Sequence, residues 1–449
     1  MLADAVVHTV DAPDPGPSWL RLGYRMLPVF SLAASRGAAV LAQFLVQLAV
    51  SSMAGAAGLG VLQLFTSWTC IAGEVLARGL PTRAMRLVSV AYADRGAHVI
   101  ERILRDARRQ ILRLWLSLLV LALVPAALLL TSQATSDWIY YGHLLLAAVL
   151  VAPLFSLCRL YAESLKATGA SLAAVTLESL TSPVALLLVC ALCWLTGQTL
   201  AAATLLVTFG FSLAITPIAL HRKLQRQLAR LQPAPGSPEH DLAMPAPPRG
   251  ELSSLWGSSV LSIGFMQLPF IVLPFYADTG EIGVFAVAHK LINVITTLLL
   301  LLAAVFGPAF ARTAAQRDAS DLLSLLRRTQ AISVAVFLPL ALLLIALAGP
   351  LSGLFGQEFG DLHLLLVILT AGQMINAATG LPGVLLNMAG AAASELFALV
   401  IALLVAVAGS IWVGPVHGVI GLAMVFSGSI ALKNILSYTL ARQHLATMR

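Results

Sequence analysis

The chain has 449 residues, of which 59% are hydrophobic and only 10% are charged, and its mean hydropathy is +0.91. Soluble globular domains are about 45–50% apolar and about 25% charged, so a soluble enzyme is excluded. Four cysteines are too few for a disulfide scaffold. The net charge of +7 does not call for a nucleic-acid partner, because basic side chains also bind the anionic lipids of the inner leaflet.

Apolar runs separated by turn residues and charges predict about 12 transmembrane helices. Each run can cover the ~30 Å hydrocarbon core at about 1.5 Å per residue. The backbone must be helical there, because lipid offers it no other hydrogen-bond partner. The predicted class is therefore an all-α polytopic membrane protein. The predicted spans are 30–53, 58–80, 111–130, 141–160, 172–195, 199–220, 252–276, 282–307, 330–349, 362–386, 394–413 and 418–439.

The 27 Lys and Arg predict the orientation of these spans. Five connections between the spans contain none of them, namely the loops near 131–140, 196–198, 277–281, 350–361 and 414–417. The positive-inside rule then places both termini on the cytoplasmic side. The expected location is a bacterial inner (plasma) membrane. Residues 1–27 contain three Asp and three Pro, which predicts a cytoplasmic disordered tail rather than a cleaved signal.

A basic, Pro-rich segment divides the spans into six and six. We interpret it as a cytoplasmic linker without a core of its own. The predicted organisation is a tail at 1–27, an N-terminal six-helix lobe at 28–220, a linker at 221–251, a C-terminal six-helix lobe at 252–440 and a tail at 441–449.

A sequence repeat relates the two lobes at an offset near 220 residues. Gly60-Val61 returns as Gly283-Val284, and Gly169-Ala170 returns as Gly390-Ala391. Because six is an even number of spans, the two halves share one topology and form a parallel repeat. The sequence thus predicts two pseudo-symmetric six-helix halves around a central cavity, a geometry typical of alternating-access transport.

Three stretches, Ala57–Val61, Glu281–Leu291 and Ile368–Gly390, resemble the polysaccharide transporter (O-antigen flippase type) branch of the multidrug/oligosaccharidyl-lipid/polysaccharide (MOP) flippase superfamily. The resemblance implies a non-enzymatic flippase that carries an undecaprenyl-pyrophosphate-linked oligosaccharide from the inner to the outer leaflet. Relatives often have a charged residue where this chain has Met266-Gln267. Lipid II flippases of the superfamily typically have fourteen spans, so a peptidoglycan precursor is the less expected cargo.

Lys290 is the first candidate for a cargo-binding residue. An ionisable side chain at membrane depth costs several kcal/mol unless it is paired or hydrated. Lys290 lies about two turns into span eight, and a cation there would suit a pyrophosphate crossing the membrane. This reading relies on the family motif, and the alternative is a lysine that snorkels to the interface.

Polar side chains in three other spans are further candidates for substrate binding. Arg36, Gln43 and Gln47 share a face of span one and could bind sugar hydroxyls or a second phosphate. The alternative is an interfacial arginine with two interhelical hydrogen bonds. Gln267 and Asn376 each lie just before a proline break, and broken helices in matching parts of a repeat point to a binding site.

Glu74 and Arg78 are four residues apart near the inner end of span two. They could form a proton or cation coupling site or a gate, and the alternative is a structural ion pair at a helix end. Lys433 is expected to snorkel. Glu178 and Glu395, which the repeat roughly matches, are expected at helix interfaces.

The sequence predicts no cofactor, since it has no P-loop and its one Cys-x-x-Cys motif lies in an apolar span without nearby ligands. Energy would come from an ion gradient, the membrane potential or the substrate gradient. Basic residues in 83–110 predict contact with anionic membrane lipids. The polysaccharide polymerase and glycosyltransferases of the same pathway are further candidate partners, which no residue specifically supports.

Two other functions remain open. A multidrug or organic-cation antiporter of the same superfamily would need an acidic cavity. A membrane enzyme of polysaccharide assembly would need a large catalytic loop, whereas the longest outer loop has about twelve residues. The acids on that side, Asp137, Asp278, Glu281, Glu358 and Asp361, lie in three separate short loops.

Overall fold

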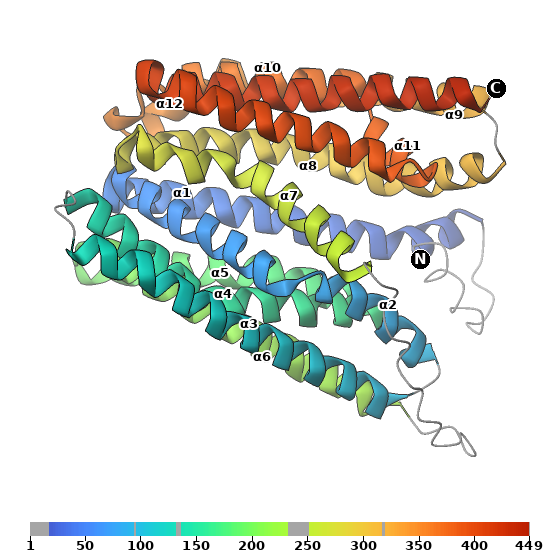
Figure 1. The fold of residues 1–449 in the computed structure, drawn as a ribbon, viewed down its shortest axis with the longest axis horizontal. Helices are drawn as coiled ribbons and strands as arrows, with labels where there is room; N and C mark the ends of the chain where they lie inside the picture. Colours follow the sequence, from blue (N-terminus) through green and yellow to red (C-terminus); the bar gives the residue numbers. More distant parts are fainter. Residues whose placement is uncertain (1–17, 94–95, 132–135, 232–250, 317–318, 449) are drawn as a thin grey trace. The chain divides into compact units, whose positions relative to one another are not determined.

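The computed structural model describes residues 18–93, 96–131, 136–231, 251–316 and 319–448, which are mostly helical (Figure 1). The α-helices are α1 (Ser18–Ala77), α2 (Leu80–Ala93), α3 (Ala97–Thr131), α4 (Ser136–Ala167), α5 (Ser171–Thr196), α6 (Ala202–Leu228), α7 (Glu251–Val272), α8 (Thr279–Ala315), α9 (Ala319–Phe355), α10 (Leu362–Thr379), α11 (Pro382–Met388) and α12 (Ala392–Thr447). The 3₁₀ turns are η1 (Leu273–Phe275) and η2 (Gln357–Phe359). The prediction of an all-α polytopic membrane fold is confirmed.

Eight helices in the described part of the chain are long and apolar enough to cross a membrane, namely α1, α4, α5, α6, α7, α9, α10 and α12. Two of them, α1 with 60 residues and α12 with 56, are long enough for two crossings each. Each contains a kink at a glycine of positive φ, Gly55 (67°) in α1 and Gly418 (50°) in α12. When both are divided there, the twelve predicted spans fall on α1, α3 to α10 and α12.

The helix ends refine the predicted segments. α1 begins at Ser18, so residues 18–27 of the predicted tail are helical, whereas residues 1–17 lie outside the described part of the chain. α6 extends to Leu228, into the predicted linker, of which residues 232–250 are not described. The break predicted in span ten is present, because Gly380 has a φ of 76° between α10 and α11.

The chain divides into two compact units. Unit 1 contains Met1–Val46, Trp68–Gln198 and Ala203–Ser259, and unit 2 contains Gln47–Ser67, Thr199–Ala202 and Val260–Arg449. The units differ from the predicted lobes chiefly in the middle of α1, since Gln47–Ser67 groups with the C-terminal helices.

In unit 1, α4 packs against α2, α3 and α5. An apolar core fills the space between α2, α3, α4 and α6, and its fully buried members include Val88, Ile100, Ile111, Leu160, Leu165, Leu220 and Leu224. Side-chain bonds to backbone carbonyls add to the packing: Ser156 Oγ donates to Gly73 O (2.6 Å) and Trp115 Nε1 donates to Val149 O (3.0 Å). These contacts hold the basic part of α3 next to α4 and α6.

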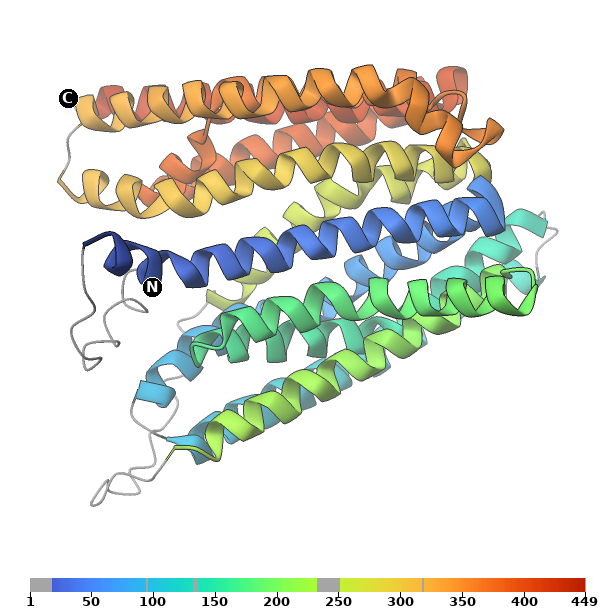
Figure 2. The same ribbon diagram turned by 180° about the vertical axis from the view of Figure 1, so that it is seen from behind.

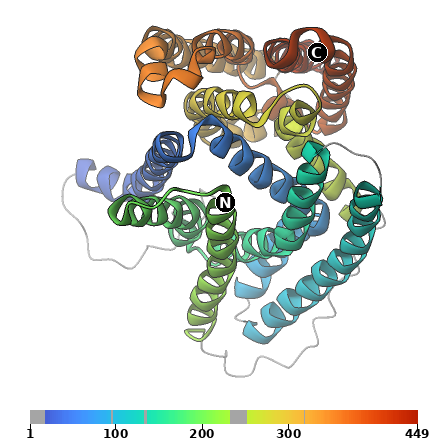
Figure 3. The ribbon, with the colours of Figure 1, turned by 90° about the vertical axis from the view of Figure 1, so that its left-hand side faces the viewer.

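In unit 2, α10 lies between α9 and α12, and α8 packs on α9 and α10 (Figures 2 and 3). The segment Gln47–Ser67 packs against this group at Gly60 and Gly283, two residues that have no side chain. A Cβ on Gly60 would overlap the carbonyl oxygen of Thr279, and a Cβ on Gly283 would overlap that of Ala56. The start of α8 therefore meets α1 backbone against backbone.

Candidate functional site

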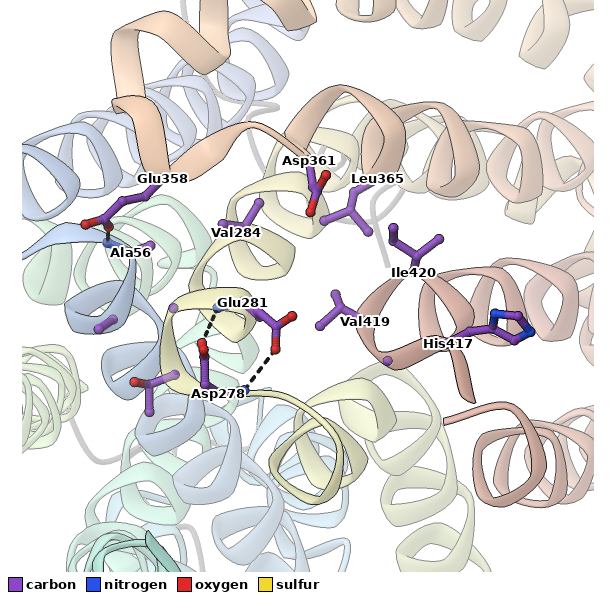
Figure 4. Close-up of a pocket in the computed structure, with 14 residues that line it drawn as sticks. Ala56, Asp278, Glu281, Val284, Glu358, Asp361, Leu365, His417, Val419 and Ile420 are labelled. Atoms are coloured by element: carbon purple, nitrogen blue, oxygen red, sulfur yellow. Dashed lines mark hydrogen bonds between the residues drawn. The ribbon is translucent and has the colours of Figure 1, made fainter. Parts of the chain in front are cut away.

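A pocket of about 560 Å³ lies in unit 2, where the start of α8 meets α1, η2, α10 and the kink of α12 (Figure 4). Its ionisable lining residues are four carboxylates and one histidine: Asp278, Glu281, Glu358, Asp361 and His417. Four of the five outer acids, which the sequence distributes over separate short loops, thus meet around one cavity. Among the described residues, no group of three or more His, Cys, Asp or Glu could hold a metal ion.

Three of the four carboxylates bind backbone amides at helix ends. Asp278 Oδ1 accepts from Glu281 N (2.8 Å), and Glu281 Oε2 accepts from Asp278 N (3.1 Å), which forms a capping box at the start of α8. Glu358 Oε2 accepts from Ala56 N (2.7 Å), directly after the kink at Gly55. These carboxylates hold the helix ends in place, and the sequence analysis did not predict the role of Glu358.

Lys290 and Gln267 lie on neighbouring elements of unit 2, α8 and α7. Lys290 is half-buried, and the preceding residue His289 is buried in an aromatic cluster with centroid distances between 5.4 and 6.0 Å to the rings of Phe270, Phe285 and Phe426. Gln267 Oε1 is buried and has no hydrogen-bond partner among the described residues. A buried acceptor without a partner is costly, which makes Gln267 a candidate contact for a polar ligand.

The remaining predicted binding residues are distributed over both units. Asn376 Nδ2 donates to Gln373 Oε1 (2.9 Å) on α10, and Gln47 is buried in unit 2. Arg36, which is exposed, and Gln43, which is half-buried, belong to unit 1. The predicted stripe of Arg36, Gln43 and Gln47 is present on one helix, although its last member groups with the other unit.

The predicted helical pair of Glu74 and Arg78 is not formed. α1 ends at Ala77, and Arg78 follows it with a φ of 47° and an exposed side chain. Glu74 is only 3% exposed, and its Oε2 has no hydrogen-bond partner in the described part of the chain. The spacing suggested a pair because the helix was expected to continue to residue 80, whereas the turn carries the guanidinium away.

Each unit contains a lysine paired with one of the acids that the repeat matches. In unit 2, Lys433 pairs with Glu395, whose Oε2 also accepts from Ser437 Oγ (2.6 Å). In unit 1, Lys166 pairs with Glu178 (3.3 Å) and with Glu163 (2.9 Å). Lys433, which was expected to snorkel, thus has a carboxylate partner that the sequence analysis did not predict. The repeat matches only the two acids, because Lys166 corresponds to Asn387 at the same offset and Lys433 has a different place in its lobe.

The described residues share their fold with transporters. A multidrug resistance MATE family transporter of the MOP superfamily, in an inward-facing conformation, is 13% identical over 91% of this chain and 95% of its own, with a TM-score of 0.71. The lipid II flippase MurJ is 14% identical over 93% and 89%, with a TM-score of 0.63. A MOP superfamily transporter from Pyrococcus furiosus is 14% identical over 94% of each chain, with a TM-score of 0.60.

The fold is therefore shared with these solved transporters of the MOP superfamily. No curated protein matches the chain by sequence. The family model described as polysaccharide biosynthesis protein matches residues 253–364 of the chain. The predicted resemblance to polysaccharide transporters of the MOP superfamily is confirmed by the family match and by the shared fold.

Proposed function

We propose that this transporter moves an undecaprenyl-pyrophosphate-linked oligosaccharide, the repeat unit of a surface polysaccharide such as lipopolysaccharide or exopolysaccharide, from the cytoplasmic to the periplasmic leaflet. The observation that carries the proposal is the union of a MOP transporter fold with a polysaccharide biosynthesis segment in one chain. Likeness to a lipid II flippase agrees with a lipid-linked cargo. The cargo is moved without chemical conversion, so the protein is not an enzyme.

The proposed transport cycle is alternating access between two six-helix lobes, 28–220 and 252–440, around a central cavity. Its twelve spans lie in the bacterial inner membrane, and both termini are cytoplasmic. The sequence repeat supports the two related halves. The positions of the basic residues support the orientation.

The proposed cargo site contains cationic and amide side chains. Lys290 neutralises the pyrophosphate, whose charge is the main obstacle to crossing a medium of low dielectric constant. Gln267, whose oxygen lacks a partner among the described residues, accepts from sugar hydroxyls. The other proposed contacts are Arg36, Gln43, Gln47 and Asn376.

Glu74 is the proposed coupling residue. A carboxyl group that is almost fully buried and has an unpartnered oxygen in the described part of the chain gains from binding a proton or a small cation. Arg78 is separated from it by the turn after α1, so we propose that Glu74 acts without Arg78 as a fixed counter-ion.

Mass spectrometry of lipid extracts from a strain depleted of this protein tests the proposal. We expect one undecaprenyl-linked oligosaccharide to accumulate while the matching surface glycan is lost, with both effects reversed by the wild-type gene. An unchanged lipid pool, together with new sensitivity to cationic dyes, would contradict it. That outcome would favour an ion-coupled multidrug antiporter, the second candidate, which the fold likeness to a MATE transporter and the buried Glu74 support.

A further inference from the structure

A second cavity, of about 180 Å³, lies in unit 1 between α3, α4 and α6. It is formed where the first turns of α3 and the last turns of α6 pack on the same core. Its polar lining residues are Glu101, Arg105, Arg108, Tyr161, His221 and Gln225. None of them belongs to the proposed cargo or coupling site.

The lining contains several hydrogen-bond donors and one acid, Glu101. In the part of the chain that the structure describes, Arg105 and Arg108 have no carboxylate within ion-pair distance. The His221 ring packs against Tyr161 with centroids 4.9 Å apart and ring planes tilted by 43°, and its buried Nδ1 has no hydrogen-bond partner there. Two guanidinium groups and a ring nitrogen around one small cavity match the donors that bind a phosphate group.

The helices continue from this cavity as exposed apolar stripes. On α3, Leu112 and Leu116 follow Arg105 by seven and eleven residues, so they share its face, and they are 39% and 56% exposed. On α6, Ile218 lies one turn before His221 and is 53% exposed, and Phe211 lies two turns further and is 68% exposed. A soluble phosphate would make no use of these stripes, whereas acyl chains would cover them.

We propose that the pocket binds the phosphate of an anionic phospholipid headgroup, while the acyl chains lie along the apolar stripes of α3 and α6. Basic pockets between helices at the cytoplasmic side of a membrane bind such headgroups. The sequence predicted that this region contacts anionic lipids in general. The pocket narrows this to one site, with named side chains that would bind the phosphate. Glu101, the one acid of the pocket, favours a headgroup with hydroxyl or ammonium donors beside the phosphate.

Thermal unfolding of the full-length protein in detergent tests this site, with phosphatidylglycerol, phosphatidylcholine or inorganic phosphate added. We expect phosphatidylglycerol to raise the melting temperature more than phosphatidylcholine does. Most of the difference should be lost in Arg105→Gln/Arg108→Gln and kept in Arg108→Lys. Arg109→Gln is the matched control, because Arg109 is an exposed arginine of the same helix that does not line the pocket.

Equal loss in Arg109→Gln, or an unchanged difference in Arg105→Gln/Arg108→Gln, would overturn the site. An equal rise with inorganic phosphate alone would overturn the assignment to a lipid. Arg105 and Arg108 are exposed outside the apolar core, so these substitutions leave the packing of α3 intact.

Discussion

Gly60 and Gly283 occupy equivalent positions of the sequence repeat and pack against each other in unit 2. Each glycine faces the carbonyl oxygen of the residue four positions before the other, Thr279 for Gly60 and Ala56 for Gly283. The contact is thus reciprocal, as expected for two related segments that meet about a local two-fold axis. It explains why both copies of the motif have glycine at this point.

A side chain at either position should force the helices apart. We expect Gly60→Ala and Gly283→Ala each to lower the free energy of unfolding by about 1–3 kcal/mol, because a Cβ would overlap backbone rather than a flexible side chain. Thermal or denaturant unfolding of the purified variants measures this. Gly264→Ala is the control, since nothing lies within 4 Å of its Cβ position, and equal stability of all three variants would refute the contact.

Glu358 should hold the second half of α1 at its start. Glu358→Ala removes a charge-assisted bond to Ala56 N, which contributes about 1 kcal/mol at such an accessible site. We expect hydrogen exchange of the Ala56 amide to become several-fold faster. Asp361→Ala removes another carboxylate of the same pocket that makes no cap bond, so exchange should not change there. Equal exchange in the two variants would argue against the bond.

Lys433 should stabilise unit 2 through Glu395. Lys433→Ala leaves a carboxylate without its ammonium partner, although Ser437 still donates to it. The two side chains are 21% and 16% exposed, so we expect a loss of about 1–3 kcal/mol, below the ~3–5 kcal/mol of a fully buried pair. A double-mutant cycle with Glu395→Ala measures the coupling. Additive losses would show that the pair contributes nothing.

Lys290 should be needed for export and not for membrane insertion. We expect Lys290→Ala to abolish surface polysaccharide at normal protein level, whereas Lys290→Arg keeps part of it because the positive charge remains. Lys223→Ala, which removes the same charge from the exposed end of α6, is the control. The amount of surface glycan measures export, and the amount of protein in the membrane measures insertion. Normal export by Lys290→Ala would show that Lys290 is not part of the cargo site.

Glu74 and Arg78 should behave differently, because they are not paired. We expect Glu74→Gln to stop export that depends on the ion gradient, since the amide can neither bind a proton nor balance a cation. Arg78→Gln should have little effect, because Arg78 is exposed beyond the end of α1. Surface glycan measured before and after a protonophore is added distinguishes the two. An equal loss of export in both variants would instead indicate that Glu74 and Arg78 act as a pair.

The sequence by itself determined the membrane class, the positions of the helices and the break at Gly380, because these depend on local composition and backbone preference. It also located both copies of the glycine motif. It did not predict that Gly60 and Gly283 touch, because a repeat reports equivalence and not contact.

Only the tertiary structure decided which polar groups meet. Glu358 accepts from Ala56 across 302 residues of sequence, and Glu395 accepts from Ser437 across 42. Conversely, Glu74 and Arg78 are four residues apart and yet unpaired, since α1 ends at Ala77 and a left-handed turn begins at Arg78. Hydropathy and residue spacing depend only on neighbours along the sequence. The energy of an ion pair or a hydrogen-bonded cap falls off within a few ångströms, so it depends on where the whole chain brings the two groups.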